Sequence, residues 1–188
     1  MSRPLPPQPA KLVIGMLLSE RAMFPEIAAE LAARFSPPDL VSPWLPFGYT
    51  SYYEKEMGAP LWRRVLAFSG WFAQDGLAKI KLQTNALEQA HLAAGRRRVN
   101  IDPGYLLLER FVLATGKNFS HRIYIGGGIY ADLTLVFRHG AYQPLPWTYP
   151  DYADAPLSGF LQRVRRKVAA DLAADQAGAL GGPLSRHD

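Results

Sequence analysis

The chain has 188 residues, of which 48% are hydrophobic and 20% are charged, so it can bury a sizeable core. This composition excludes a wholly disordered chain. The absence of cysteine excludes disulfides, thiolate metal sites and cysteine nucleophiles. The formal charge of +5 is concentrated in two basic runs, Arg96–Arg98 and Arg163–Lys167, because the remainder carries 14 basic and 16 acidic residues. Such runs either bind anionic partners or form a solvated helix face, and both interpretations stay open.

The first part of the chain predicts an arm, a strand and two helices. Four prolines within residues 1–10 predict a flexible extended arm. The apolar run Leu12–Leu18 is too short to span a bilayer and is not followed by a signal-peptide cleavage site, so it predicts a buried strand in a cytosolic protein. Proline positions and apolar spacing predict helices over about 25–35 and 61–72.

The middle of the chain combines strand-like and helix-like patterns. Residues 77–82 alternate between apolar and lysine side chains, which predicts a strand. Asn85 and Glu88 have the spacing of a capping box, which predicts a helix over 85–94. A short strand is expected over 98–101. The Asp-Pro pair at 102–103 is typical of a helix start and predicts a helix to about Ala114, with a strand over 105–113 as the alternative.

The last part of the chain predicts a hairpin and a helix. Strands over 121–125 and 129–137 flank Gly126–Gly128, a run that lacks the helix of a phosphate loop and is typical of a hairpin turn. A helix over about 156–174 follows. The sequence therefore predicts an α/β (α+β) single domain over residues 11–175, with a C-terminal hairpin followed by a helix, and a disordered tail over 176–188. Its mixed sheet should have about five to seven strands, with four or five helices.

Lysines close to a predicted helix start form the first candidate binding site. Lys79 and Lys81 would project from one face of the 77–82 strand, which leads to the helix N-terminus at Asn85. Together these groups would bind a phosphate or a carboxylate. The alternative is a solvent-facing edge strand that its lysines protect from pairing.

Two polar clusters supply further candidates. Asp102, at the end of a predicted strand, could be a general base or only a helix cap, and Glu54 is a second acid/base candidate. Lys117 and Arg122 could hold an anion, and His121 could carry a proton. Alternatively, His121 is an ordinary core residue and Arg122 only pairs across the hairpin with Asp132, itself a candidate ligand contact.

Aromatic residues supply candidate stacking surfaces, and metal motifs are missing. Tyr53 and Trp147 could stack on a base or another ring. There is no His-Glu-x-x-His, and the four histidines are scattered, so the sequence predicts no metal site and identifies no cofactor. It also leaves open whether the chain catalyses a reaction.

Several motifs resemble those of a bacterial family, the domain of unknown function family 4416, over about residues 9–170. They are Tyr52–Gly58, Lys79–Asn85, Val99–Tyr105, Leu113–Lys117, His121–Tyr124, Gly128–Asp132 and Trp147–Tyr152. The chain departs from the family pattern at Asp132, where Glu is usual, and at Gly116, where Thr is usual. The resemblance implies a single cytosolic domain and carries no known function.

Three functional hypotheses follow from these residues. The leading one is a site for a phosphorylated or nucleotide-like small molecule, built from the lysines, Arg122 and the carboxylates. The second is an RNA-associated module that uses the basic runs and the tyrosines. The third is a scaffold that meets a partner protein through Trp147–Tyr152. No membrane association is expected, and the oligomeric state is left open.

Overall fold

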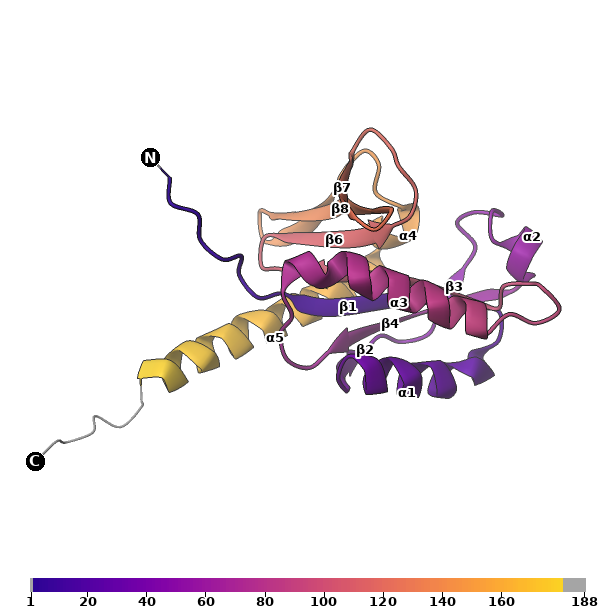
Figure 1. Ribbon diagram of the computed structural model, residues 1–188, viewed down its shortest axis with the longest axis horizontal. Helices are drawn as coiled ribbons and strands as arrows, with labels where there is room; N and C mark the ends of the chain where they lie inside the picture. The colour runs from indigo at the N-terminus through magenta and orange to yellow at the C-terminus, as the bar shows by residue number, and fades with distance from the viewer. Residues whose placement is uncertain (1, 181–188) are drawn as a thin grey trace, which may run out of the picture.

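Nine strands form one antiparallel sheet in the computed structural model, which describes residues 2–180 (Figure 1). The strands are β1 (Lys11–Leu18), β2 (Pro38–Val41), β3 (Leu45–Phe47), β4 (Leu61–Phe68), β5 (Val99–Leu106), β6 (Arg110–Thr115), β7 (Arg122–Gly126), β8 (Ile129–Arg138) and β9 (Ala141–Pro144). Their order is β2-β4-β1-β5-β6-β8-β7, with β3 also paired to β4 and β9 to β8. The predicted α+β fold class is confirmed. All strand pairs of the described residues are antiparallel, so the sheet is not mixed as expected, and it has nine strands rather than five to seven.

Five α-helices accompany the sheet. They are α1 (Phe24–Arg34), α2 (Glu54–Met57), α3 (Leu77–Ala90), α4 (Pro150–Ala153) and α5 (Ala155–Leu180), and short 3-10 turns at Arg21–Met23 and Gln74–Gly76 precede α1 and α3. No helix of the described part is long and apolar enough to cross a membrane. The predicted hairpin followed by a helix is confirmed by β7, β8 and α5.

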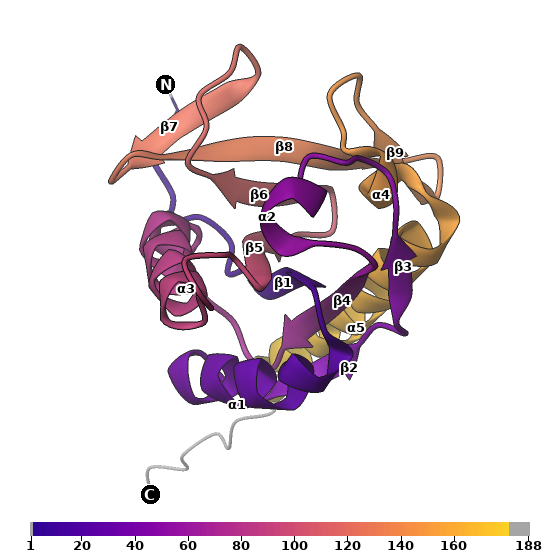
Figure 2. The ribbon, with the colours of Figure 1, turned by 90° about the vertical axis from the view of Figure 1, so that its right-hand side faces the viewer.

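The helices cover both faces of the sheet because the side chains of each strand alternate between them. In β1, Ile14 and Met16 pack against α1 and α3, whereas Val13 faces the cluster formed by Leu157, Phe160 and other apolar residues of α5. Figure 2 shows the curved sheet with α3 and α5 on opposite sides of it. The continuous apolar run of β1 is thus explained by burial on both faces.

Elements with strong local patterns were predicted correctly. β1 and α1 agree with the predicted 12–18 strand and 25–35 helix. The hairpin has the predicted pairing of Arg122 with Asp132, and Tyr124 pairs with Tyr130 before a bulge brings Gly126 opposite Ile129. α5 extends past the predicted end at Ala174 to Leu180, and the rest of the predicted tail, 181–188, lies outside the described residues.

Three predicted elements were wrong. Residues 61–68 of the predicted 61–72 helix form β4, the predicted 77–82 strand is the first half of α3, and the predicted 102–114 helix is parts of β5 and β6. In α3 the buried positions include Leu77, Ile80, Thr84 and Leu87, which follow helical spacing, while Leu82 is 47% exposed. The alternation over residues 77–82 is therefore too short to distinguish a strand from a helix. Packing of one face of α3 against the sheet determines the structure of this segment.

The sheet splits between β5 and β6, and this split positions the candidate site. β5 pairs with β6 only from Gly104 to Leu106, although it pairs with β1 along its whole length. Pro103 has no N–H to donate, so it cannot extend the ladder. At Ile101, side chains of α3 replace β6: Lys81 donates to the carbonyl and Glu88 accepts from the N–H. The strands diverge here, and α3 closes one side of the gap.

Candidate functional site

A cavity of about 780 Å³ occupies this split, within the size range of small-molecule sites. Its lining comes from α3, α4, β3, β4, β5, β6, β8, the segment before α2 and residues of the neighbouring loops. Four cations line it, Arg63, Lys81, Arg97 and Lys117, and so do four carboxylates, Glu88, Asp102, Asp132 and Asp151. The formal charges of the lining therefore cancel, and the position of each charge determines what the cavity can bind.

The floor of the cavity, defined here as Lys81, Glu88 and Asp102, joins α3 to β5. The Lys81 ammonium donates to the Ile101 carbonyl at 2.6 Å and lies 3.7 Å from Glu88 Oε1 and 3.8 Å from Asp102 Oδ1. Asn100 donates to the other Asp102 oxygen, Oδ2, at 2.7 Å. Lys81 and Glu88 are buried, while the Asp102 side chain is 24% exposed. Asp102 is thus the carboxylate of the floor that a ligand can reach most easily.

Burial raises the pKa of Glu88, and the nearby Lys81 acts in the opposite direction. Glu88 Oε1 accepts a 2.7 Å hydrogen bond from the Ile101 N–H, and Oε2 lies 3.8 Å from Arg97 Nε. Arg97 also donates to Asn100 Oδ1 at 3.0 Å. The Arg97 guanidinium therefore holds Asn100 in place, and Asn100 in turn holds Asp102.

A buried ion pair forms another wall. Arg63 of β4 lies 2.8 Å from Asp151 of α4, and both are at least 90% buried. Burial acts to lower the pKa of Arg63, but Asp151 and other neighbours raise it above its usual value, so the guanidinium stays charged. Gly15 is required beside this pair because a Cβ there would lie 2.8 Å from the Tyr152 hydroxyl oxygen and 3.0 Å from Arg63.

Two tyrosines, the half-buried Tyr53 and the buried Tyr152, add hydroxyl groups to the lining. Burial raises the pKa of Tyr53 and of Tyr152, so both phenols stay protonated at neutral pH and can donate hydrogen bonds. The Tyr152 oxygen lies 3.5 Å from Arg63 Nη1.

The mouth of the cavity, defined here as Tyr49, Tyr52, Lys117 and Tyr149, is aromatic and basic. The three tyrosines are 42–55% exposed. Lys117 donates to the Tyr52 hydroxyl at 2.9 Å, and its ammonium lies 4.3 Å from the ring centroid of Tyr52. Tyr49 donates to Asp154, and this hydrogen bond is the main cause that raises the pKa of Tyr49 to about 12. Among the described residues, no carboxylate pairs with Lys117, unlike the other three lining cations.

Asp132 connects the hairpin to the mouth. Its carboxylate, 3% exposed, accepts from Arg122 Nε at 2.9 Å and lies 3.3 Å from His121 Nε2. Arg122 also donates to the Lys117 carbonyl and to the Tyr149 hydroxyl, each at 2.9 Å. The Asp132 carboxylate therefore orients the Arg122 guanidinium, which contacts both the Lys117 and the Tyr149 sides of the mouth.

The structure brings together six of the eleven predicted site residues. Tyr53, Lys81, Asn85, Asp102, Lys117 and Asp132 line the cavity. His121 and Arg122 stand behind Asp132. Asn85 lies within α3, so its predicted role as a helix cap is wrong.

The remaining three predicted residues also lie outside the cavity, as His121 and Arg122 do. Lys79 is exposed and does not share a face with Lys81, because residues two apart on a helix point in different directions. Glu54 is exposed at the start of α2. Trp147 stacks on His121 with ring centroids 4.7 Å apart and donates to the Leu133 carbonyl, so one face of its ring is already covered.

The sequence did not identify several polar lining residues, notably Arg63, Glu88, Arg97, Asn100 and Asp151. Glu88 offered a signal, since it falls on the apolar stripe of α3. Arg63 and Tyr152 lie 89 positions apart in the sequence, so no local sequence pattern predicts their contact.

Most basic residues of the two runs form hydrogen bonds or ion pairs within the protein. Arg97 contacts Asn100 and Glu88, Arg98 pairs with Glu20, Arg165 donates to the Leu108 carbonyl, and Lys167 pairs with Asp171. Their free positive charge is therefore smaller than the sequence suggests.

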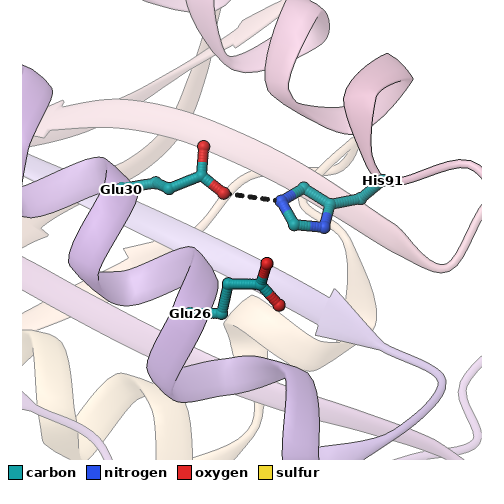
Figure 3. A group of neighbouring side chains, drawn as sticks. All are labelled: Glu26, Glu30 and His91. Carbon is teal, nitrogen blue, oxygen red and sulfur yellow. Dashed lines mark hydrogen bonds and ion pairs between the residues drawn. The ribbon is translucent and has the colours of Figure 1, made fainter.

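Outside the cavity, Glu26, Glu30 and His91 form the group in the described part of the chain that could hold a metal ion, with ligand atoms within 4.8 Å of one another (Figure 3). The Glu30 carboxylate accepts a hydrogen bond from Arg34 at 3.1 Å, and its other oxygen lies 2.8 Å from His91 Nε2. Glu26 is exposed. The contact of Glu30 with His91 connects α1 to the end of α3, which accounts for the arrangement without an ion.

A known family matches most of the chain. The model of the family described as domain of unknown function (DUF4416) matches residues 8–168, which include the whole sheet and the whole cavity lining. No curated protein and no solved structure matches the chain. Because the match covers most of its length, the chain belongs to the DUF4416 family.

Proposed function

We propose that the cavity binds a phosphorylated or nucleotide-like small molecule. The observation that supports this most is the position of Lys117: it lies at the mouth and forms no ion pair with a carboxylate in the described part of the chain. The remaining lining cations are balanced by carboxylates. An anionic ligand group beside Lys117 would give this ammonium the negatively charged partner that the other lining cations already have. Ammonium groups are common phosphate ligands.

The aromatic mouth supports a ligand that also carries a ring. Tyr52 and Tyr149 are 55% and 45% exposed beside Lys117, and Tyr53 lines the cavity below them. Stacking of a base on an aromatic ring contributes about 1–3 kcal/mol in nucleic-acid-binding proteins. A ligand with a planar ring and a phosphate would therefore use both features of the mouth.

The proposal concerns binding in the cytosol. Asp102 is the residue through which the proposal would extend to catalysis. Of the three predicted acid/base residues, Asp102 contributes a carboxylate to the cavity, whereas Glu54 and His121 do not line it. The RNA-binding and scaffold hypotheses have less support, because the basic runs are largely paired and Trp147 packs on His121.

The proposal predicts thermal stabilisation by nucleoside monophosphates or sugar phosphates. A ligand at 100 times its Kd stabilises the folded state by about 2.7 kcal/mol, which should raise the Tm by about 5–10 °C for a chain of this size. Lys117→Ala should reduce the shift because it removes the free ammonium. Lys79→Ala is the matched control, since Lys79 is exposed on α3 outside the cavity, and should leave the shift unchanged.

Differential scanning fluorimetry across a panel of such phosphates, with inorganic phosphate included, provides the measurement. No shift with any compound would overturn the proposal, and so would an equal loss of the shift in both lysine variants.

A further inference from the structure

The hydrogen-bonding capacity of the cavity floor is only partly used. The Lys81 ammonium has three N–H donors, and the structure shows one hydrogen bond from it, to the Ile101 carbonyl. Its contacts of 3.7 Å with Glu88 and 3.8 Å with Asp102 are ion pairs that are too long for hydrogen bonds. Lys81 is 93% buried, so few other partners can reach its ammonium. In the described part of the chain, Asp102 Oδ1 accepts no hydrogen bond.

Only some ligand groups can form hydrogen bonds with both the free donors of Lys81 and the free acceptor of Asp102. An ionised carboxylate accepts hydrogen bonds, and an ammonium donates them. A hydroxyl does both through one oxygen, so a ligand hydroxyl beside Lys81 can accept from the ammonium while it donates to Asp102. A ligand that covers the floor has to satisfy these donors and acceptors, because polar groups that are buried without a hydrogen-bond partner cost stability. The floor is thus complementary to hydroxyl groups.

Charged ligand groups fit the floor poorly. A phosphate or carboxylate there would face Glu88 and Asp102, and a ligand ammonium would face Lys81. The floor therefore favours a neutral group, whereas Lys117 at the mouth favours an anionic one. The cavity has an anion-binding end and a hydroxyl-binding end.

We propose that Lys81 and Asp102, with Glu88 beside them, recognise sugar hydroxyls, so that the ligand class is a ribonucleotide or a sugar phosphate with a free vicinal diol. This inference rests on the proposed function, because it assigns the binding site of the sugar in the same ligand. It adds that the floor discriminates between hydroxylated and deoxygenated ligands. Sites that hydrogen-bond a substrate hydroxyl reject analogues without it, because their own polar groups are left unpaired.

Isothermal titration calorimetry with matched ligand pairs tests the inference on the unaltered protein. The pairs are ribonucleoside 5′-monophosphates with their 2′,3′-dideoxy counterparts, and ribose 5-phosphate with 2-deoxyribose 5-phosphate. At least one hydroxylated ligand should bind at least tenfold more tightly than its deoxygenated partner. Equal affinities within each pair that binds would overturn the inference and leave the proposed function standing, whereas no binding by any compound would overturn both.

Asp102→Asn tests the residue assignment, because it keeps the side-chain size while it replaces one acceptor oxygen with an amide. We expect the preference for the hydroxylated ligand to fall at least tenfold, with weaker binding of that ligand and little change for its deoxygenated partner. Glu54→Gln is the matched control, since Glu54 is an exposed carboxylate outside the cavity, and it should keep the preference. An unchanged preference in Asp102→Asn would contradict the assignment.

Discussion

Lys81 shows how one residue can be identified correctly for the wrong reason. The alternating pattern of residues 77–82 marked Lys79 and Lys81 as equivalent, but α3 exposes the first and buries the second. Lys81 is held by the Ile101 carbonyl, Glu88 and Asp102. A sequence gives residue types that can carry a charge, but it cannot tell which lysine has carboxylates around it when those come from another element.

Substitution of the two lysines should therefore have unequal effects on stability. Lys81→Met leaves Glu88 and Asp102 without their shared ammonium, and breaking a buried ion pair in this way costs about 3–5 kcal/mol. We expect a loss near the lower end, about 3 kcal/mol, because Asp102 is partly exposed. Lys79→Met should change stability by less than about 0.5 kcal/mol. Urea unfolding of both variants measures the difference, and similar losses would contradict the placement of Lys81.

At the scale of elements, the 12–18 strand, the 25–35 helix, the hairpin and the last helix were predicted correctly, whereas the 61–72 and 102–114 helices and the 77–82 strand were not. The apolar face of α5, with Leu157, Leu161 and Val164 buried, was visible in the sequence, as was the hairpin with its glycine turn. Asp102-Pro103 has the composition of a helix start, yet in β5 the proline ends the pairing with β6. The split in the sheet, and hence the cavity, depends on how α3 docks on β5 and could not be predicted locally.

The contact of α1 with α3 through Glu30 and His91 should make stability depend on pH. The hydrogen bond with His91 is the main cause that holds the pKa of Glu30 below its usual value of 4.5. A lowered pKa in the folded state means that the contact stabilises the protein above about pH 4.5 and is lost as the pH falls through the lowered value. We expect Glu30→Gln to be less stable than the unaltered protein at pH 6, by at most about 1 kcal/mol, because the pair is partly exposed.

Urea unfolding at pH 6 and near pH 3.5 checks this dependence. The difference between the two proteins should shrink at the lower pH. Glu26→Gln is the control, because Glu26 lies beside Glu30 on α1 but makes no hydrogen bond or ion pair in the described part of the chain. A difference that is constant with pH would show that Glu30 contributes through packing alone.

At the scale of the whole molecule, the net charge is a poor guide to the site. The +5 comes from two runs whose members largely pair within the fold, while the cavity contains four cations and four carboxylates. Arg63 and Asp151 reach the site from β4 and α4, which are far apart in the chain. The family resemblance predicted the domain, but only the folded chain shows that Lys81, Asp102 and Lys117 share one cavity.

The most direct test of this account is to locate a bound ligand by NMR. Amide chemical shifts of the ¹⁵N-labelled protein would be compared with and without saturating ribose 5-phosphate or a ribonucleoside monophosphate. We expect the changes to concentrate in residues 49–53, 81–89, 100–102 and 113–117, which line the cavity. Unchanged spectra with every compound, or changes confined to Arg96, Arg98 and Arg163–Lys167, which lie outside the lining, would contradict the central claim that this cavity is the binding site.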